Sequence, residues 1–160
     1  MRKADSLRRW LTAYIPDLKT HPDRLQIFVE SGTVASRQSR TLSFTYQYTL
    51  KVMIEEFAGD ADVLIVPLLA WIENEQPQLL RRQDSSPFSF EAELLDSETS
   101  DIEFSIDLTE SRLVKARAGG TGYDIERPAE PRFADAFEGV STSFSGLFVG
   151  DETLLADPSA

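Results

Sequence analysis

Between Leu42 and Phe57 the sequence alternates between apolar and polar side chains almost without exception. One face of this segment receives Phe44, Tyr46, Tyr48, Leu50, Val52 and Ile54, and the other receives Ser43, Thr45, Gln47, Thr49, Lys51 and Glu55. A period of two is typical of a strand with one buried face. Sixteen residues at about 3.3 Å each would span roughly 50 Å, more than the width of a small domain. We therefore expect a long half-buried strand that either bends or leaves the body as an arm that binds a partner.

One helix is predicted before this strand and one after it. The first runs from Ala4 to Ile15, with apolar residues spaced three and four apart, Asp5 or Ser6 as N-cap and Pro16 as a stop. The second follows Asp60 or Asp62, either of which can cap it, and ends at Glu75. Its Pro67 removes a backbone donor, at a cost of about 3 kcal/mol inside a helix, so we expect a kink or a late start.

The remaining elements are predicted to be strands and loops. A short strand at Leu25–Glu30 precedes a basic, Ser/Gly-rich loop at Ser31–Arg40. Phe88–Leu95 and Ile102–Leu108 alternate again, with Phe88, Phe90, Ala92 and Leu94 facing inward on the former, and Arg112–Arg117 forms a last strand. The predicted fold class is α+β: two helices packed on a mostly antiparallel sheet, in the order helix, strand, strand, helix, three strands, followed by an extended C-terminal tail.

Charge is distributed unevenly along the chain, whose net charge is −11. Residues 1–83 hold eleven Lys/Arg and ten Asp/Glu, whereas residues 84–160 hold five and seventeen. In the predicted hairpin, the outward positions Glu91, Glu93, Glu103 and Asp107 form a wall of like charge that a partner or cations would relieve. The negative potential of such a surface repels phosphate, which disfavours tight binding to nucleic acid.

The composition also bounds the domains and the location of the protein. We expect one α+β domain at residues 1–118 and an acidic, Gly/Pro-containing tail at 119–160, whose spaced phenylalanines suggest segments that dock on another surface and order there. The longest apolar run is Val63–Ile72, well below the roughly 18 residues that cross a bilayer, and no export signal is evident. We expect synthesis in the cytoplasm and no membrane partner.

Catalytic chemistry finds little support in the sequence. The chain has no cysteine and one histidine, His21 in a Pro-Asp turn, so no metal site is expected. No nucleophile motif is present, and the glycines at 119–122 lack the lysine of a phosphate-binding loop. Carboxylate pairs occur, but any acidic strand supplies them. We therefore predict no catalytic, metal or cofactor residues and no enzyme activity.

Several short segments, in order and spanning residues 1 to about 115, resemble the tail completion protein R family of contractile-tailed temperate phages and related prophages. They are Met1-Arg2-Lys3 with Asp5-Ser6-Leu7-Arg8, Pro22-Asp23-Arg24-Leu25, Ser43-Phe44 with Tyr46 and Tyr48-Thr49-Leu50, Phe57-Ala58-Gly59, Val66-Pro67-Leu68-Leu69-Ala70-Trp71, and Gln76-Pro77 with Leu79-Leu80. The resemblance implies a virion morphogenesis protein built like a tail terminator. It implies a homo-hexameric ring that caps the tail tube and sheath, offers a surface to neck and connector proteins, and lets DNA pass only as cargo.

Candidate interface residues follow from combining this resemblance with the pattern of charge. The basic loop and the long strand would pair across subunits, the acidic hairpin would face the channel or a basic partner ring, and the tail would clasp a neighbour. The residues are Arg37, Arg40, Glu55, Asp96, Glu98, Asp101, Phe144 and Phe148. Alternatives are a head-side neck connector of the virion, a monomeric acidic binding or inhibitor module, and, last, a carboxylate-dependent hydrolase.

Overall fold

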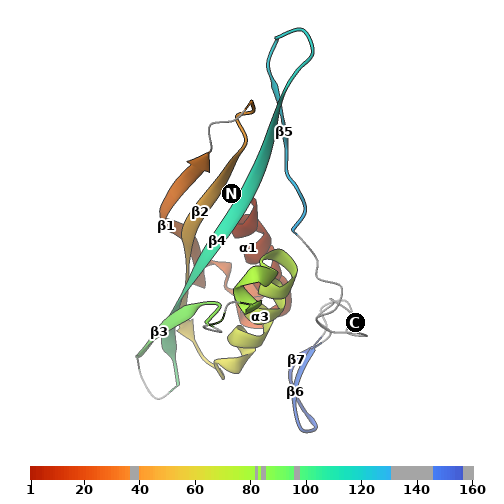
Figure 1. Ribbon diagram of the computed structural model, residues 1–160. Helices are drawn as coiled ribbons and strands as arrows, with labels where there is room; N and C mark the ends of the chain where they lie inside the picture. The colour runs from red at the N-terminus through yellow and green to blue at the C-terminus, as the bar shows by residue number, and fades with distance from the viewer. Residues whose placement is uncertain (37–39, 82, 84–85, 96–97, 131–145, 157–160) are drawn as a thin grey trace.

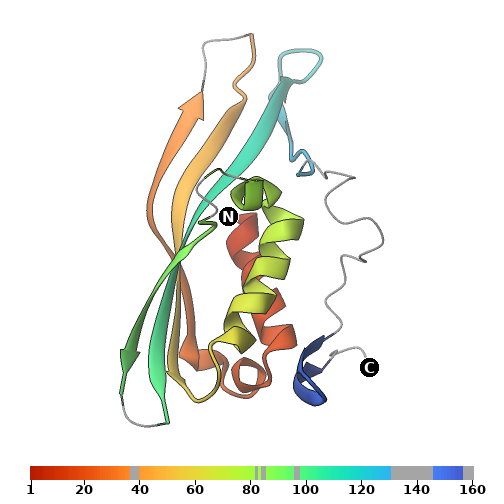
Figure 2. The same cartoon turned by 60° about the horizontal axis from the view of Figure 1, so that its bottom comes forward.

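An antiparallel sheet with helices on one face forms the body of the protein in the computed structural model (Figures 1 and 2). The structure describes residues 1–36, 40–81, 83, 86–95, 98–130 and 146–156. In chain order, the elements in these residues are α1 (Arg2–Tyr14), α2 (Pro16–Thr20), a 3₁₀ turn (Pro22–Arg24), β1 (Leu25–Ser36), β2 (Phe44–Phe57), α3 (Asp62–Glu75), a 3₁₀ turn (Pro77–Arg81), β3 (Ser89–Leu94), β4 (Ser100–Ala116), β5 (Tyr123–Glu126), β6 (Gly146–Val149) and β7 (Glu152–Ala156).

The predicted fold class and order of elements are confirmed. The strands lie in the order β1-β2-β4-β3, with β5 paired to β4, and the described pairings are antiparallel. The strand predicted from the alternation, β2, is central: β1 pairs with one edge and β4 with the other. A separate hairpin is formed by β6 and β7.

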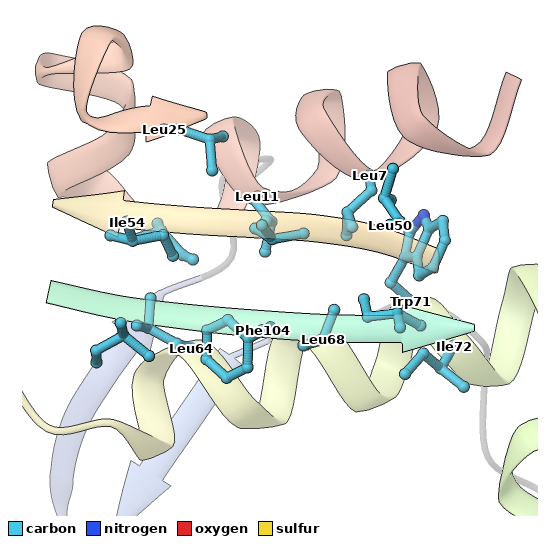
Figure 3. Close-up of a cluster of buried hydrophobic side chains, with 14 of the residues drawn as sticks. Leu7, Leu11, Leu25, Leu50, Ile54, Leu64, Leu68, Trp71, Ile72 and Phe104 are labelled. Atoms are coloured by element: carbon cyan, nitrogen blue, oxygen red, sulfur yellow. The ribbon is translucent and has the colours of Figure 1, made fainter. Parts of the chain in front are cut away.

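The core lies between the sheet and the two long helices, as Figure 3 shows. The inward row of β2, from Tyr48 to Ile54, is buried, as is the matching row of β4. The helices contribute the other half of the core, through Leu7, Leu11, Leu64, Leu68, Trp71 and Ile72. The period of two on the strands and the apolar spacing of the helices therefore meet in one core, as the sequence predicts.

Two tryptophans join the helices to each other. The indole nitrogen of Trp10 donates to the carbonyl oxygen of Pro67 at 2.8 Å, and that of Trp71 donates to the hydroxyl of Ser6 at 3.2 Å. Trp71 is buried and Trp10 is partly buried against the core, and the one polar atom of each ring has a partner. This pair of contacts fixes how α1 and α3 lie side by side.

Both helices begin differently from the expectation. α1 starts at Arg2, so neither Asp5 nor Ser6 is its N-cap. The N-cap is Met1, whose side chain forms no capping hydrogen bond. α3 runs through Pro67 from Asp62, so the late start is wrong. The N-cap of α3 is Ala61, so neither Asp60 nor Asp62 is the cap; the Asp60 carboxylate accepts the backbone N–H of Asp62 at 3.0 Å from the turn before the helix.

Two strands are longer than the sequence predicts. β1 continues to Ser36, past a register shift between Val29 and Ser31, so most of the expected loop at Ser31–Arg40 is strand. β4 is a single strand of 17 residues that joins the two predicted strands Ile102–Leu108 and Arg112–Arg117. The polar residues between those two segments belong to the ladder with β2.

β3 corrects an expectation about burial. Phe90, Ala92 and Leu94 pair with inward residues of β4 or continue their row, so they lie on the predicted face of the sheet. All six residues of β3 are nevertheless exposed, because this edge strand lies beyond the reach of the helices. The alternation predicts which face a side chain occupies, but not whether anything covers that face.

The sheet is longer than the helices that cover it. In Figure 2, β1, β2 and β4 extend together past the N-terminal end of α1. The strand β2 therefore does not leave the body alone as an arm, since it remains paired on both sides. β5 continues this projection after a turn in which Gly119 and Gly120 have φ of 93° and 71°, values that favour glycine.

Substitution in the inward row tests the assignment of the core. We expect Leu50→Ala, at a side chain that is 0 % exposed, to lower the free energy of unfolding by about 2–5 kcal/mol, because it leaves a cavity. Leu94→Ala on β3 is the matched control, and its effect should stay within about 0.5 kcal/mol. Urea unfolding of both variants at low protein concentration measures the difference. Equal effects would contradict the assignment.

Candidate assembly surfaces and the polar network between them

A buried carboxylate connects α1 to the sheet. Glu110 on β4 is 3 % exposed. Its oxygens accept the backbone N–H groups of Arg2 at 3.4 Å and Lys3 at 3.2 Å. The Tyr48 hydroxyl donates to it at 2.6 Å, and the Arg112 guanidinium pairs with it. Glu110 therefore caps the start of α1 from a distant strand, where the partial positive charge of the helix favours an anion.

These contacts determine the charge state of Glu110. Burial by itself raises the pKa of its carboxyl, but the hydrogen bonds from Tyr48, Arg112 and the Lys3 amide, together with the Arg112 charge, lower the pKa from 4.5 to about 2. The pKa of the Tyr48 hydroxyl is raised by burial and by Glu110. Glu110 is thus ionised and Tyr48 is a neutral donor at physiological pH.

A second group of polar side chains covers the backbone of β4. The Lys3 ammonium donates to the carbonyl oxygen of Thr109 at 2.8 Å and to the side-chain oxygen of Gln76, which also accepts the backbone N–H of Thr109 at 3.3 Å. Glu130 forms an ion pair with Lys3 at 2.6 Å. Burial lowers the pKa of Lys3, while Glu130 and Glu110 oppose that shift. Side chains thus satisfy strand groups of Thr109 that would otherwise need another strand.

The expected acidic wall forms, and it has a cation of its own. Glu91 lies opposite Glu103, and Glu93 lies opposite Asp101, in the ladder of β3 with β4. Lys51 on β2 donates to Glu103 at 2.6 Å and lies 3.8 Å from Glu30. Its hydrogen bond with Glu103 raises the Lys51 pKa. Lys51 therefore relieves part of the repulsion, on the face of the sheet opposite the helices, which we call the open face.

A cleft of about 540 Å³ lies at the other end of the sheet. Phe44, Tyr46 and Ile125 line it with apolar and aromatic surface, and Arg2, Arg112 and Arg127 contribute guanidinium groups. Met1 and the carboxylate of Asp5 complete the lining, and we call this site the arginine cleft. Arg112 lies 5.5 Å from the centre of the Tyr46 ring, a cation–π distance. Ile125 on β5 is 61 % exposed.

The structure distributes the predicted interface residues rather than gathering them. Arg40 lies in the connection between β1 and β2, at the end of the sheet that holds the arginine cleft. Glu55 and Asp101 lie near the opposite end; Glu55 accepts the side-chain amide of Gln26 at 3.0 Å, and Asp101 accepts the backbone N–H of Glu56 at 2.8 Å. These two carboxylates have local partners in addition to any role in assembly.

The remaining predicted interface residues divide into two groups. Glu98 is exposed just before β4, and Phe148 on β6 is 58 % exposed. Arg37, Asp96 and Phe144 lie outside the described residues. Sequence reasoning missed the arginine cleft and the Glu110 network, although the inward parity of Glu110, which continues the row from Ile102 to Leu108, was a signal for the latter.

Two further features concern the part of the chain that the structure describes. Within it, no group of three or more His, Cys, Asp or Glu side chains is placed to hold a metal ion. None of the helices described there has the length and apolar character needed to cross a membrane.

Unlike surfaces at the two ends of one sheet, one acidic with exposed apolar residues and one rich in arginine, are typical of a subunit that functions by assembling with other proteins. Residues 1–131 match the family described as P2 phage tail completion protein R (GpR), and the chain belongs to that family. It is 42 % identical over 134 residues to "Tail completion protein R" of Escherichia phage P2, a match that covers 82 % of this chain and 86 % of that protein. No solved structure matches the chain.

The Glu110 network predicts a specific dependence on pH. The folded-state pKa lies below the ordinary value, so the stabilisation from Glu110 is present above pH 4.5 and is lost as the pH falls toward 2. Glu110→Gln should lower the free energy of unfolding at pH 7 by about 3 kcal/mol, following from the shift at 1.36 kcal/mol per pH unit, and should flatten the dependence between pH 4.5 and 2.

Unfolding by urea across this pH range measures both effects. The control is Glu56→Gln, because the Glu56 side chain is 62 % exposed and its ion pair with Arg24 at 3.0 Å lies at the surface. We expect the control to change stability by less than about 1 kcal/mol. A Glu110→Gln variant with the wild-type pH profile would contradict the role assigned to this carboxylate.

Proposed function

We propose that this chain completes a phage tail as a terminator ring. In this proposal six copies close around the end of the tail tube and sheath, stop their growth and offer a surface to the neck and connector proteins. The observation that carries the proposal is the family match over residues 1–131, together with the identity to a protein named Tail completion protein R. The role is structural rather than enzymatic, and the protein acts at the virion tail and neck after synthesis in the host cytoplasm.

Features of the sheet support a ring-forming subunit. β1 and β3 are edge strands, and their outer edges carry backbone groups available for pairing. Exposed apolar side chains occur at both ends of the sheet, including Leu94 at 81 % and Ile125 at 61 %. A monomer that functioned alone would gain nothing from such surfaces, whereas repeated contacts between copies would bury them.

We assign the open face of the sheet to the channel of this ring. The part of it away from β3 carries Glu30, Glu103 and Asp107, and no described helix covers it. A negative wall repels the phosphates of DNA, so DNA would pass as cargo without binding. The alternative orientation, in which this face contacts a basic partner ring, would satisfy the same charges.

Two other functions make different predictions. A head-side neck connector would bind a portal-associated ring and ignore tail tubes. A monomeric acidic inhibitor would bind a basic enzyme with one copy and would not assemble. The edge strands and the two unlike exposed surfaces favour the ring over the inhibitor, and the family match favours the tail over the head side.

The proposal is tested with the purified protein and the cognate tail tube protein. We expect addition of the protein to polymerising tubes to shorten them, with a ring of density at one end in electron micrographs and a mass near six copies by light scattering. Bovine serum albumin at equal concentration is the control for non-specific effects. Tubes of unchanged length, with a protein that stays monomeric beside them, would overturn the proposal.

A test of the channel assignment replaces two carboxylates of the open face by amides of the same shape, which can still accept hydrogen bonds. Asp107→Asn and Glu30→Gln together remove two charges from the open face. If this face lines the channel, tails still assemble with the variant but deliver DNA less efficiently. Loss of tail binding with normal folding would assign the face to a partner ring instead.

A further inference from the structure

The strand β3 presents an apolar ridge that nothing in the described structure covers. Phe90 and Leu94 lie on the same face of β3 and are 56 % and 81 % exposed. Glu91 and Glu93 point to the other face of the same strand. We call these four residues the β3 ridge. Leu94 has the highest exposed fraction among the large apolar side chains of the described chain, so a partner that covers it is energetically favoured.

The arginine cleft has the complementary chemistry. Phe44, Tyr46 and Ile125 give it apolar and aromatic surface. The guanidinium groups of Arg2 and Arg127 form no ion pair with another described residue, whereas Arg112 is held by Glu110. Asp5 is the one carboxylate in the lining, so positive charge remains in excess beside the apolar surface. This combination fits a segment that carries carboxylates next to a bulky apolar side chain. The β3 ridge has this composition.

A ridge cannot reach the cleft of its own copy. Figure 1 shows β3 and β5 at opposite ends of β4. Leu94 lies opposite Ser100, and Ile125 lies opposite Val114. From Ser100 to Val114 the strand β4 advances by fourteen residues, which at about 3.3 Å each separate the two positions by roughly 46 Å. Contact between the two surfaces therefore requires two molecules.

We propose that the β3 ridge of one copy binds in the arginine cleft of the next. The edge of β3 enters the cleft, so that Leu94 on one face of the strand packs on Tyr46 and Ile125, while Glu91 and Glu93 on the other face pair with Arg2 and Arg127. Because the two surfaces are unlike, the contact is head-to-tail, and repeating it closes a ring or extends a filament. This contact rests on the proposed function for its biological setting, and it supplies the subunit interface that the ring requires.

Engineered cysteines test the contact in solution, without tail tubes. The chain has no native cysteine, so disulfides report only the introduced pairs. We expect a mixture of Leu94→Cys and Ile125→Cys proteins to form disulfide-linked dimers under mild oxidation at least about tenfold faster than either variant alone, since unlike surfaces meet. Non-reducing gels at high protein concentration measure the rate.

The control replaces Ile125→Cys with Phe28→Cys. Phe28 is also exposed, at 47 %, but it lies opposite Lys51 and therefore on the open face. Its mixture with Leu94→Cys should crosslink at the slow background rate. Crosslinking of Leu94→Cys with itself at the fast rate would replace the proposal with a symmetric interface, and equal rates in both mixtures would overturn it.

Reversal of charge provides an independent test. Arg127→Glu should weaken self-association by at least about tenfold, and adding Glu93→Arg in the same chain should restore most of it. Lys115→Glu is the control, since Lys115 is 62 % exposed outside the cleft and pairs with Glu126 at 2.8 Å; it should change association by less than about twofold. Light scattering measures association, and circular dichroism confirms folding.

If the double variant self-associates as weakly as Arg127→Glu alone, the ridge-to-cleft pairing is wrong.

The terminator function and the ridge-to-cleft interface can be disproved independently. If wild-type protein caps tubes but the cysteine and charge variants behave like their controls, the terminator function stands and this interface is wrong. If the crosslinks form but tubes are not capped, the interface stands and the terminator function is wrong.

Discussion

A single buried carboxylate determines how the two layers of this protein meet. Glu110 anchors the amide groups at the start of α1 to the middle of β4, and Tyr48 and Arg112 complete its coordination. A buried charge of this kind costs several kcal/mol when any partner is removed, because the remaining groups are left without compensation. Shape complementarity between a helix and a sheet permits some sliding, whereas these directional bonds permit one position.

That fixed position has effects on both sides of the network. It places Lys3 against the backbone carbonyl of Thr109, whose N–H donates to Gln76 at the end of α3. It also places Met1 and Arg2 at the cleft. The same contacts that hold the core together therefore shape an exposed surface, so the stability of the fold and the geometry of that surface are coupled. The uncovered end of β3 has no such network and is free to present its side chains outward.

The sequence allowed much of this structure to be predicted. The alternation of β2 and the spacing in α1 predicted the sheet, the helices and nearly all of the core, since burial of one face imposes those periods. The single β4 was divided in two because Glu110 interrupts an apolar row. Arg112 is close in sequence, but the other partners, Tyr48 and the start of α1, lie more than sixty residues away and leave no local trace. α1 began early for the same reason, since its cap comes from another element.

The surfaces were less predictable than the core. The acidic wall could be predicted from the alternation of side chains along each strand, and it is present in the structure. The ion pair of Lys51 with Glu103, which reduces the repulsion, could not be predicted in this way because it depends on the order of the strands in the sheet. The arginine cleft draws residues from the first helix, from β2 and β4, and from β5 and the residue that follows it. The alternation correctly predicted which face of the sheet Phe90 and Leu94 occupy. It also implied that helices cover these side chains, but the helices are too short to reach them. Local patterns encode neighbours in a strand, whereas these surfaces depend on where distant elements end.

The continuity of β4 has a mechanical consequence. Its acidic end and its arginine-rich end belong to one uninterrupted strand, paired with β2 from Ser100 to Arg112. In an antiparallel ladder the hydrogen bonds run perpendicular to the strands, so a pull along β4 loads many of them simultaneously in shear. Tension applied between the two ends of the subunit would therefore be carried by the hydrogen bonds of the sheet rather than by the helices.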